Sequence, residues 1–308
     1  MLRAPCALIL LVAGAALGEE LQGFDLAGLR VPRELLVEGG PGREGIKAVD
    51  EPRFAAPEEA HWVAPDSPVL GVALGGQARA YPVHLLEWHQ VVNDELASAP
   101  LVVTFDPIAG APRAFRREAA GRRLDFGVSG LLYNSNFLLF DRPTGSLWSQ
   151  WNGQAVAGPL AGQTLSPVEV RQEVFAAWLE RHPGAAVLER PLPQQIDYRH
   201  SPFKAYWVAD RIPFPVKAED RSYHAKEVVV GVVVRGRARA YLGSRVASRG
   251  GGVEDEFQGA KLRIAYDTNS STFRWEVPEG VEVGEAYWFA WKAWHPDTDV
   301  WGGEADAP

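Results

Sequence analysis

The chain has 308 residues, of which 46% are hydrophobic and 23% charged, a balance typical of a globular protein that can bury a sizeable core. Its length fits one large domain or two of ordinary size. A formal net charge of −8, with no basic block or basic helix, excludes a protein that binds nucleic-acid phosphates through a positive surface.

The first eighteen residues predict an export signal. Residues 1–3 (MLR) are a basic start, and residues 7–16 are an apolar run too short to span a bilayer. Residues 16–18 (ALG) then place small side chains at the −3 and −1 positions of a cleavage site. A buried core segment is the alternative. We expect residues 1–18 to be a signal peptide and the protein to be exported, either periplasmic or extracellular. No later segment is long and apolar enough for a membrane helix.

The chemistry open to the chain depends on that cleavage. Cys6 is the only Cys and Met1 the only Met. A chain cleaved after Gly18 would hold no thiol, disulfide or thioether. Thiolate-zinc, iron–sulfur, copper-thioether and cysteine-nucleophile sites would then be excluded.

The rest of the chain divides by its Gly and Pro content and by its strand-like runs. The expected segments are an N-terminal arm over 19–45, a first β-rich lobe over 46–188, a Pro-rich crossing segment over 189–220, a second β-rich lobe over 221–301 and a tail over 302–308.

One stretch of the first lobe occurs again in the second. Residues 71–81 (GVALGGQARAY) match residues 231–241 (GVVVRGRARAY) at seven of eleven positions, at an offset of 231 − 71 = 160. Each copy predicts a β-hairpin. Residues 101–106 (LVVTFD) are echoed by 262–267 (LRIAYD) in the same order. We therefore expect an α+β fold, predominantly β, with two related lobes that arose by internal duplication.

One long helix is predicted between the lobes, over about residues 167–182. Ser166 would cap it, Pro167 would take the first helical position, and apolar residues from Val170 to Leu179 would share one face. Near the other end, Trp288, Trp291 and Trp294 lie three residues apart. That spacing favours a helical face packed in the core, with a sugar-stacking surface as the alternative.

Polar residues that are able to take part in binding or catalysis lie between residues 84 and 150, next to predicted buried strands. Polar groups in such places must bond to each other, to backbone or to a ligand, so a satisfied turn network is the plain alternative. His89 follows a Trp, and Asp94 and Asp106 are expected nearby. A His with carboxylates can bind a divalent metal or act as a general base. No HxH, HxxxH or HExxH spacing is present, and the absence of Gly-x-Gly-x-x-Gly and P-loop patterns removes dinucleotide and ATP sites.

Several stretches together resemble a known family. They are residues 80–94 (AYPVHLLEWHQVVND), 126–135 (FGVSGLLYNS), 141–150 (DRPTGSLWSQ), 288–291 (WFAW) and 295–296 (HP). On them the chain resembles the bacterial and archaeal family known as domain of unknown function 3179, from Ile46 to about Trp301.

The chain departs from that family at one turn. Members usually have Cys-Pro-x-Cys-Gly where residues 106–110 read DPIAG here. In typical members two Cys near the Trp-His pair suggest a metal or redox centre, so the resemblance implies a pocket beside His89. Here Asp106 and Ala109 stand in place of the thiols. Either Asp106 makes an oxygen-rich site, or this member keeps the scaffold without the chemistry.

Three functional hypotheses follow. The first is an envelope protein that binds a small polar ligand or a divalent metal ion. Apart from that metal ion, the cofactor is unknown. Its pocket would be lined by His89 and Asp106 as metal ligands and by Asp94, Asn134, Ser135, Asp141 and Arg142. The second is an enzyme in which His89 is the general base and Arg142 holds an anion. The third is a structural protein that binds a partner through an exposed Trp face.

Overall fold

The structure, a computed structural model, describes residues 19–191 and 196–303, so the predicted signal peptide and residues 304–308 of the predicted tail lie outside the described residues. Strands dominate it, and five of its sheets have three or more strands. The prediction of a predominantly β fold is thus confirmed. No helix within the described ranges is long and apolar enough to cross a membrane.

Two of the sheets have the same layout. The first has the order β17-β5-β6-β18-β4, and the second has the order β24-β19-β20-β25. Strands of the first are β5 (Pro68–Leu74), β6 (Gln77–Pro82), β17 (Arg171–Val174), β18 (Ala186–Leu188) and β4 (Phe54–Ala55). Strands of the second are β19 (Val228–Val234), β20 (Arg237–Leu242), β24 (Glu282–Tyr287) and β25 (Asp299–Val300). The two predicted hairpins, β5-β6 and β19-β20, are antiparallel pairs as expected.

Each hairpin continues into a short helix and a three-stranded meander. After the first hairpin these are α1 (Val83–His89), β7 (Val91–Leu96), β8 (Ala99–Asp106) and β9 (Ala111–Arg116), with β16 (Pro167–Val168) added at the edge. In the second they are α4 (Gly243–Ser248), β21 (Gly252–Phe257), β22 (Ala260–Asp267) and β23 (Thr272–Glu276). We call residues 68–116 with 167–188 the first unit, and residues 228–300 the second unit.

An outer strand, a helix and a parallel strand close each unit. They are β17, α2 (Phe175–Arg181) and β18 in the first unit, and β24, α5 (Trp288–Trp294) and β25 in the second. Ala186 of β18 pairs with Arg79, and Asp299 of β25 pairs with Arg239, so this part of the two units is offset by 299 − 186 = 113 residues. Trp178 and Trp291 obey the same offset. Each indole lies against the glycine of its own hairpin, Gly71 or Gly231, where a Cβ would come within 2.6 Å of the ring.

The first unit carries an insert over residues 118–157. It begins with the β10 (Glu118–Ala119) and β11 (Arg122–Arg123) ribbon, and its sheet has the order β15-β14-β13-β12-β3. The strands of that sheet are β12 (Phe126–Tyr133), β13 (Asn136–Asp141), β14 (Leu147–Ser149), β15 (Ala155–Ala157) and, from the N-terminal arm, β3 (Leu36–Glu38). The hairpin predicted across Asn152-Gly153 is present as β14 and β15. The remaining elements are β1 (Glu20–Leu21), β2 (Phe24–Asp25), the 3₁₀ turns η1 (Arg33–Leu35) and η2 (Pro57–Glu59), and α3 (Lys204–Val208).

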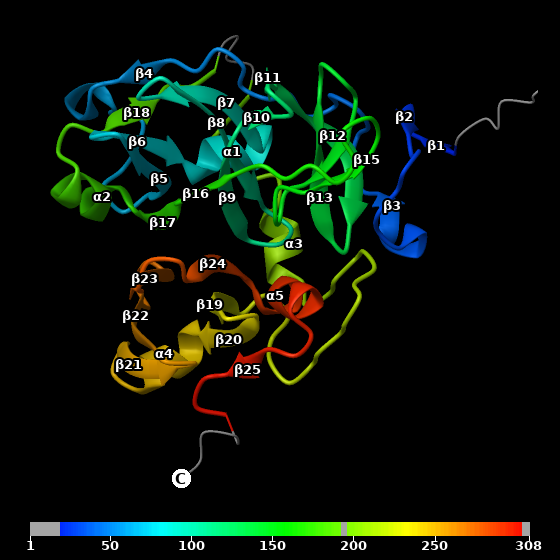
Figure 1. The fold of residues 1–308 in the computed structure, drawn as a ribbon. Helices are drawn as coiled ribbons and strands as arrows, with labels where there is room; N and C mark the ends of the chain where they lie inside the picture. The colour runs from blue at the N-terminus through cyan, green and yellow to red at the C-terminus, as the bar shows by residue number, and fades with distance from the viewer. Residues whose placement is uncertain (1–18, 192–195, 304–308) are drawn as a thin grey trace, which may run out of the picture.

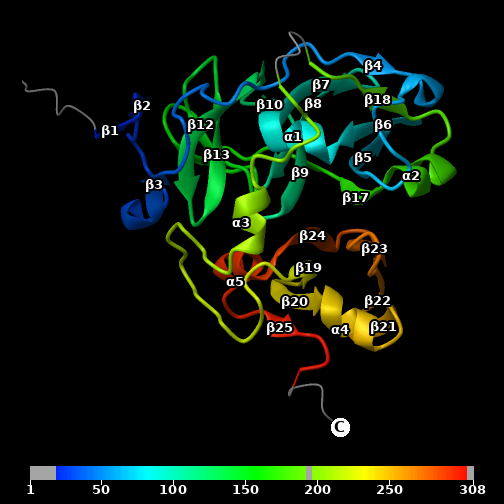
Figure 2. The ribbon, with the colours of Figure 1, turned by 180° about the vertical axis from the view of Figure 1, so that it is seen from behind.

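The first unit and the insert form the upper half of the molecule in Figure 1, and the second unit forms the lower half. The crossing segment passes between the halves, with α3 near the centre; the view from behind gives the same arrangement (Figure 2).

The long helix predicted over 167–182 is wrong in its first half. Residues 167–168 and 171–174 are strands, and only Phe175–Arg181 is helical. Arg171–Val174 pairs with β5, whose edge would otherwise expose unpaired backbone groups, and that pairing overrides a helical spacing of apolar residues. Pro167 lies on a sheet edge, where its missing N–H is tolerated. By contrast, the helix through the three Trp residues is confirmed, and Trp288 and Trp291 are buried, so the exposed Trp face of the third hypothesis gains no support.

Candidate functional site

His89, the centre of the predicted pocket, has both ring nitrogens engaged by the protein. Nδ1 lies 2.7 Å from the carbonyl oxygen of Lys47, and Nε2 lies 2.7 Å from the hydroxyl oxygen of Tyr198 in the crossing segment. Burial lowers the pKa of His89. A general base needs a nitrogen open to the substrate, and both nitrogens of His89 are already engaged.

Asp106 is fully buried and holds a turn in place. One carboxylate oxygen accepts the backbone N–H groups of Ile108 (2.8 Å) and Ala109 (3.2 Å). The other accepts the backbone N–H of Phe137 (2.9 Å) and the side-chain N–H of Asn136 (2.7 Å), which fastens the turn to β13. Burial raises the pKa of Asp106 to about 6, although these hydrogen bonds oppose the shift. The Asp106 carboxylate therefore has a structural set of partners, none of which it shares with His89.

Asp94 belongs to a cluster that both units contain. It accepts hydrogen bonds from Arg79 and from the Tyr81 hydroxyl, the latter at 2.5 Å. In the second unit Asp255 accepts from Arg239 at 3.0 Å and from the Tyr241 hydroxyl at 2.6 Å. The recurrence of the cluster in a second place assigns it to the architecture of the hairpin and meander.

The remaining predicted residues lie in separate contacts. Arg142 pairs with Glu44 (2.7 Å) and Asp50 (2.8 Å), which ties the insert to the N-terminal arm. Asp141 accepts from the side chains of Thr144 and Trp148 within the insert. Asn134 donates to the carbonyl of Ala293 and accepts from the backbone N–H of Lys217, while Ser135 donates to the carbonyl of Phe214. All of these residues except the half-buried Arg142 are buried and hydrogen-bonded, and their hydrogen bonds do not join them into one network.

No three His, Cys, Asp or Glu side chains come together in a metal-binding arrangement within 19–191 and 196–303. The metal site with His89 and Asp106 remains a prediction that nothing tests directly.

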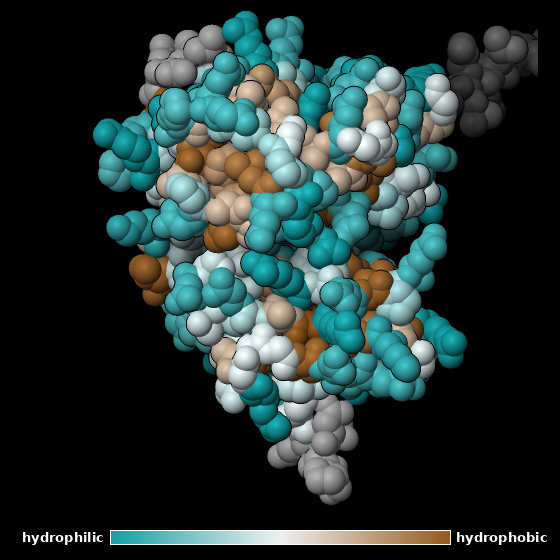
Figure 3. Space-filling view, turned by 90° about the vertical axis from the view of Figure 1, so that its left-hand side faces the viewer, coloured by the Kyte–Doolittle hydropathy of each residue, from teal (hydrophilic) through white to brown (hydrophobic). Residues whose placement is uncertain are grey.

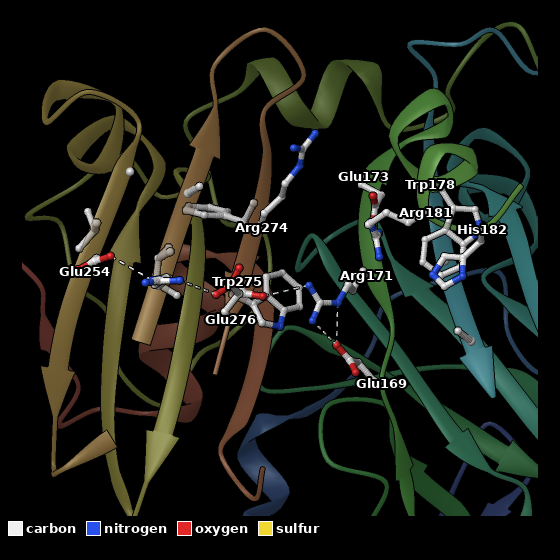
Figure 4. A pocket seen from close by; sticks show the side chains of 18 residues that line it. Glu169, Arg171, Glu173, Trp178, Arg181, His182, Glu254, Arg274, Trp275 and Glu276 are labelled. Carbon is white, nitrogen blue, oxygen red and sulfur yellow. Dashed lines mark hydrogen bonds and ion pairs between the residues drawn. The ribbon is translucent and has the colours of Figure 1, made fainter. Parts of the chain in front are cut away.

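A cavity of about 830 Å³ lies at the boundary between the two units, a size within the range of ligand sites in proteins. β5, β17 and α2 line it from the first unit, and β21, β22 and β23 line it from the second (Figure 4). Its charged side chains are Glu169, Arg171, Glu173, Arg181, Glu254, Arg263, Arg274 and Glu276. Four Glu and four Arg give the lining a formal charge of zero (4 − 4).

Most of these charged side chains form ion pairs, and each pair lies within one unit. Glu169 and Arg171 are 2.6 Å apart, and Glu173 pairs with Arg181. Arg263 bridges Glu254 at 3.0 Å and Glu276 at 3.3 Å. Figure 4 shows Arg171 reaching from the first unit to both Glu169 and Trp275, and its guanidinium lies over the Trp275 ring with its carbon 4.8 Å from the ring centroid.

Three lining residues each carry a buried side-chain atom that has no hydrogen-bond partner among the residues that the structure describes. The atoms are Nε1 of Trp178, Nε1 of Trp275 and one carboxylate oxygen, Oε2, of Glu173. The three residues are 2%, 4% and 3% exposed. Leaving a buried donor or acceptor unpaired costs about 1–3 kcal/mol, and native proteins rarely do so without a reason.

The second unit shows how one of these atoms is normally satisfied. Trp291 is the counterpart of Trp178, and its Nε1 donates to Thr298 Oγ1 at 2.9 Å. At the 113-residue offset Thr298 corresponds to Ala185 (298 − 113), which has no hydroxyl. The indole N–H of Trp178 therefore lacks the partner that its counterpart has.

The insert occupies the corresponding side of the second unit. Trp151 stacks on Trp294 of α5, with ring centroids 5.4 Å apart and an interplanar angle of 4°. The Arg113 guanidinium lies over the Trp151 ring, with its carbon 4.5 Å from the centroid. In the first unit the cavity lies at the equivalent position, beside α2.

None of the cavity residues was predicted as a site residue. One signal was present: residues 178–183 (WLERHP) and 291–296 (WKAWHP) share the pattern Trp-x-x-x-His-Pro. In both units the His ring lies against that Trp, with centroids 4.2 Å apart for Trp178 and His182 and 4.1 Å apart for Trp291 and His295.

Comparison with known proteins identifies the family of this chain. A family model described as "Protein of unknown function (DUF3179)" matches residues 43–284. No curated protein and no solved structure matches the chain.

Proposed function

Because the chain belongs to the DUF3179 family, whose description assigns no activity, we propose its function from the molecule alone. We propose that it is an exported protein of the cell envelope that binds a small polar ligand in the cavity between its two units. One observation carries this proposal: a cavity of about 830 Å³ lies at the junction of the two units and is lined by charged side chains from both. A polar ligand there would contact both units at once, as ligands at domain junctions do.

The geometry favours this cavity over the predicted pocket at His89 and Asp106. Both nitrogens of His89 and both oxygens of Asp106 already have protein partners, so a ligand there would have to break existing hydrogen bonds. The inter-unit cavity has room for a ligand without breaking those hydrogen bonds. A metal site in which His89 and Asp106 bind the same ion is therefore the weaker proposal.

The layout of the two units supports an origin by internal duplication. They share the strand order, the parallel pairing of the last strand and the position of the Trp over the hairpin glycine. Ligand sites occur preferentially at junctions of this kind between domains. After a duplication the two equivalent clefts would have diverged, one filled by Trp151 of the insert and one left open.

Export is tested by expressing the chain with its own N-terminus in a bacterium and sequencing the N-terminus of the product outside the cytoplasm. We expect the mature protein to begin at Glu19, because residues 16–18 fit a cleavage site. A product that stays inside the cell and retains Met1 would contradict export.

The cavity is tested by NMR of the protein with ¹⁵N-labelled tryptophan, with Trp178→Phe and Trp275→Phe used to assign the two indole N–H signals. Millimolar glucose, maltose, citrate, inorganic phosphate and spermidine serve as probes. We expect at least one probe to shift both signals, because Trp178 and Trp275 both line the cavity and an indole signal responds to a ligand that lies near its ring.

Ala265→Phe, which adds a ring to the cavity wall, should abolish that shift. Ala120→Phe, at an exposed turn of the insert, is the size-matched control and should leave the shift intact. If no probe moves either indole signal, the binding proposal fails.

A further inference from the structure

We propose that the inter-unit cavity binds a small carboxylate that carries an aromatic ring, and that Arg274 holds the carboxylate. This inference rests on the proposed binding function and specifies its ligand. It depends on a comparison of the cavity with its equivalent on the other side of the molecule, where Trp151 of the insert lies between the first unit and α5. We call that place the filled cleft.

Arg274 is an Arg of the cavity lining that has no ion pair with a described residue. The other three Arg side chains of the lining each pair with a lining Glu, namely Arg171, Arg181 and Arg263. Arg274 is exposed, and Figure 4 shows its side chain extending from β23 into the space between the units, with no dashed line to it. The exposed Asp267 is near enough to feel its charge, but no ion pair joins the two. A ligand oxygen could therefore bond to Arg274 without breaking an ion pair of the lining.

The counterpart of Arg274 shows what such an Arg binds. Arg274 of β23 pairs with Ala265 of β22. Arg113 of β9 pairs in the same way with Thr104 of β8, and the offset is 161 for both positions (274 − 113 and 265 − 104). Arg113 donates through Nε to the backbone carbonyl of Trp151 at 3.1 Å, and its guanidinium lies over the Trp151 ring. In the filled cleft this Arg thus binds both the aromatic ring and the carbonyl oxygen of one residue.

The protein itself does not hold Arg274 as it holds Arg113. The Arg113 guanidinium lies against Gly284 of β24, where a Cβ would come within 3.3 Å of it. Arg171 takes the position of Gly284 in the first unit, because each of the two pairs with the glycine of its own hairpin. A long cationic side chain therefore stands where Gly284 leaves space, and like charges repel, so Arg274 is kept out of the position that Arg113 occupies.

The first unit supplies a group that can contact the ring. In the filled cleft the Trp151 ring stacks on Trp294 of α5. At the 113-residue offset Trp294 corresponds to Arg181 of α2 (294 − 113), which is exposed and lines the cavity. A guanidinium also stacks on aromatic faces. Arg181 and Arg274 therefore hold the positions from which Trp294 and Arg113 contact the Trp151 ring.

Small residues beside Arg274 leave room for a ring. Gly252 and Ala265 are in register with Arg274 across the three strands of the meander, and both are exposed in the cavity lining. Their equivalents in the first unit are the larger Val91 and Thr104 (252 − 161 and 265 − 161). The cavity therefore has space next to the free guanidinium that the first unit lacks at this place.

The surrounding surface agrees with a ligand that is small and charged. Figure 3 shows the face of the molecule that carries the boundary between the units as mostly hydrophilic, with hydrophobic residues in small separate patches. A single ring could enter the cavity, whereas a long apolar chain would find no continuous apolar surface on this face.

The inference is tested by isothermal titration calorimetry with indole-3-propionate, in which the ring and the carboxylate have the spacing of the ring and the carbonyl in Trp151. We expect it to bind about tenfold or more tightly than citrate, which has no ring, and than 3-indolepropanol, which has no carboxylate. Citrate should still bind weakly through Arg274, and it should therefore be the probe that shifts the indole signals in the NMR experiment.

Variants of Arg274 test its role directly. Arg274→Gln should weaken the binding of indole-3-propionate about tenfold or more, because a charge-assisted hydrogen bond is lost. It should change the binding of 3-indolepropanol little, since that molecule has no carboxylate. Arg274→Lys keeps the charge but not the planar donor pair and should restore only part of the affinity. Arg122→Gln, at an exposed Arg of β11 outside the lining, is the matched control and should have no effect. Circular dichroism verifies that each variant is folded.

The outcomes separate the two proposals. Binding of indole-3-propionate that Arg274→Gln weakens supports both. The ligand class is overturned, and the binding function stands, if glucose, maltose, phosphate or spermidine shifts the Trp178 and Trp275 signals while indole-3-propionate does not bind. Equal affinity of wild type and Arg274→Gln for indole-3-propionate overturns the role of Arg274. If none of these molecules binds, both proposals are overturned.

Discussion

Asp106→Ala should lower the free energy of unfolding by about 4 kcal/mol, an effect near the upper end of those known for single substitutions. The variant removes the acceptor of three backbone N–H groups, those of Ile108, Ala109 and Phe137, and of the Asn136 side chain. Asp106 is fully buried, so water cannot replace the lost acceptor. Urea denaturation followed by tryptophan fluorescence measures the change.

The second unit provides a matched control. Asp267 stands at the same place in its meander, but it is exposed and accepts a backbone N–H from Asn269 at 2.9 Å. Asp267→Ala should cost less than about 1 kcal/mol, because water can satisfy the freed groups. Equal losses in the two variants would show that burial of the Asp106 turn does not determine its contribution.

Glu285→Gln should change how stability depends on pH. Glu285 lies on β24, 2% exposed, and burial together with the nearby charge of Glu173 raises its pKa from 4.5 to about 8. Between these values the folded protein retains a proton that the unfolded chain releases. Stability from this group is therefore fully present below about pH 4.5 and is lost as the pH rises through about 8.

The variant has no titrating group at this position, so its unfolding free energy should lack that decline. At pH 8.5 and above it should exceed the unfolding free energy of the wild type by about 4 kcal/mol, and below pH 4.5 the two should be equal, where the pH limits follow from the pKa shift. The measurement is urea denaturation from pH 4 to 9. Glu279→Gln, an exposed change of the same kind, should keep the wild-type dependence. Parallel profiles for wild type and Glu285→Gln would refute the assignment.

Much of the secondary structure could be predicted because it follows from local patterns. The two hairpins were evident from small and β-branched runs around Gly75-Gly76 and Gly236, and β14-β15 was evident from Asn152-Gly153. The Trp residues of α5 were evident from their spacing. The helix predicted over 167–182 was wrong in part because the pairing of Arg171–Val174 with β5 joins residues a hundred positions apart, which no local pattern records.

The site could be predicted only in part, for a related reason. Residue type and context showed that His89 and Asp106 would be buried polar groups, and the structure supplies them with Lys47, Tyr198 and the Phe137 backbone as partners. Whether a buried polar atom is satisfied depends on residues distant in the sequence. Local sequence alone therefore cannot separate a structural network from a binding site.

The sequence by itself determined the family, the strand-rich character and the recurrence of one hairpin, because these depend on motifs and on the alternation of side chains along short segments. Only the tertiary structure decided where a ligand has room to bind. The packing of one unit against the other places Trp178, Trp275 and Glu173 around one cavity. The Thr298 hydroxyl, which accepts a hydrogen bond from Trp291, has no equivalent at Ala185. An unpaired atom is a property of the completed set of contacts, and that set exists only once the chain has folded.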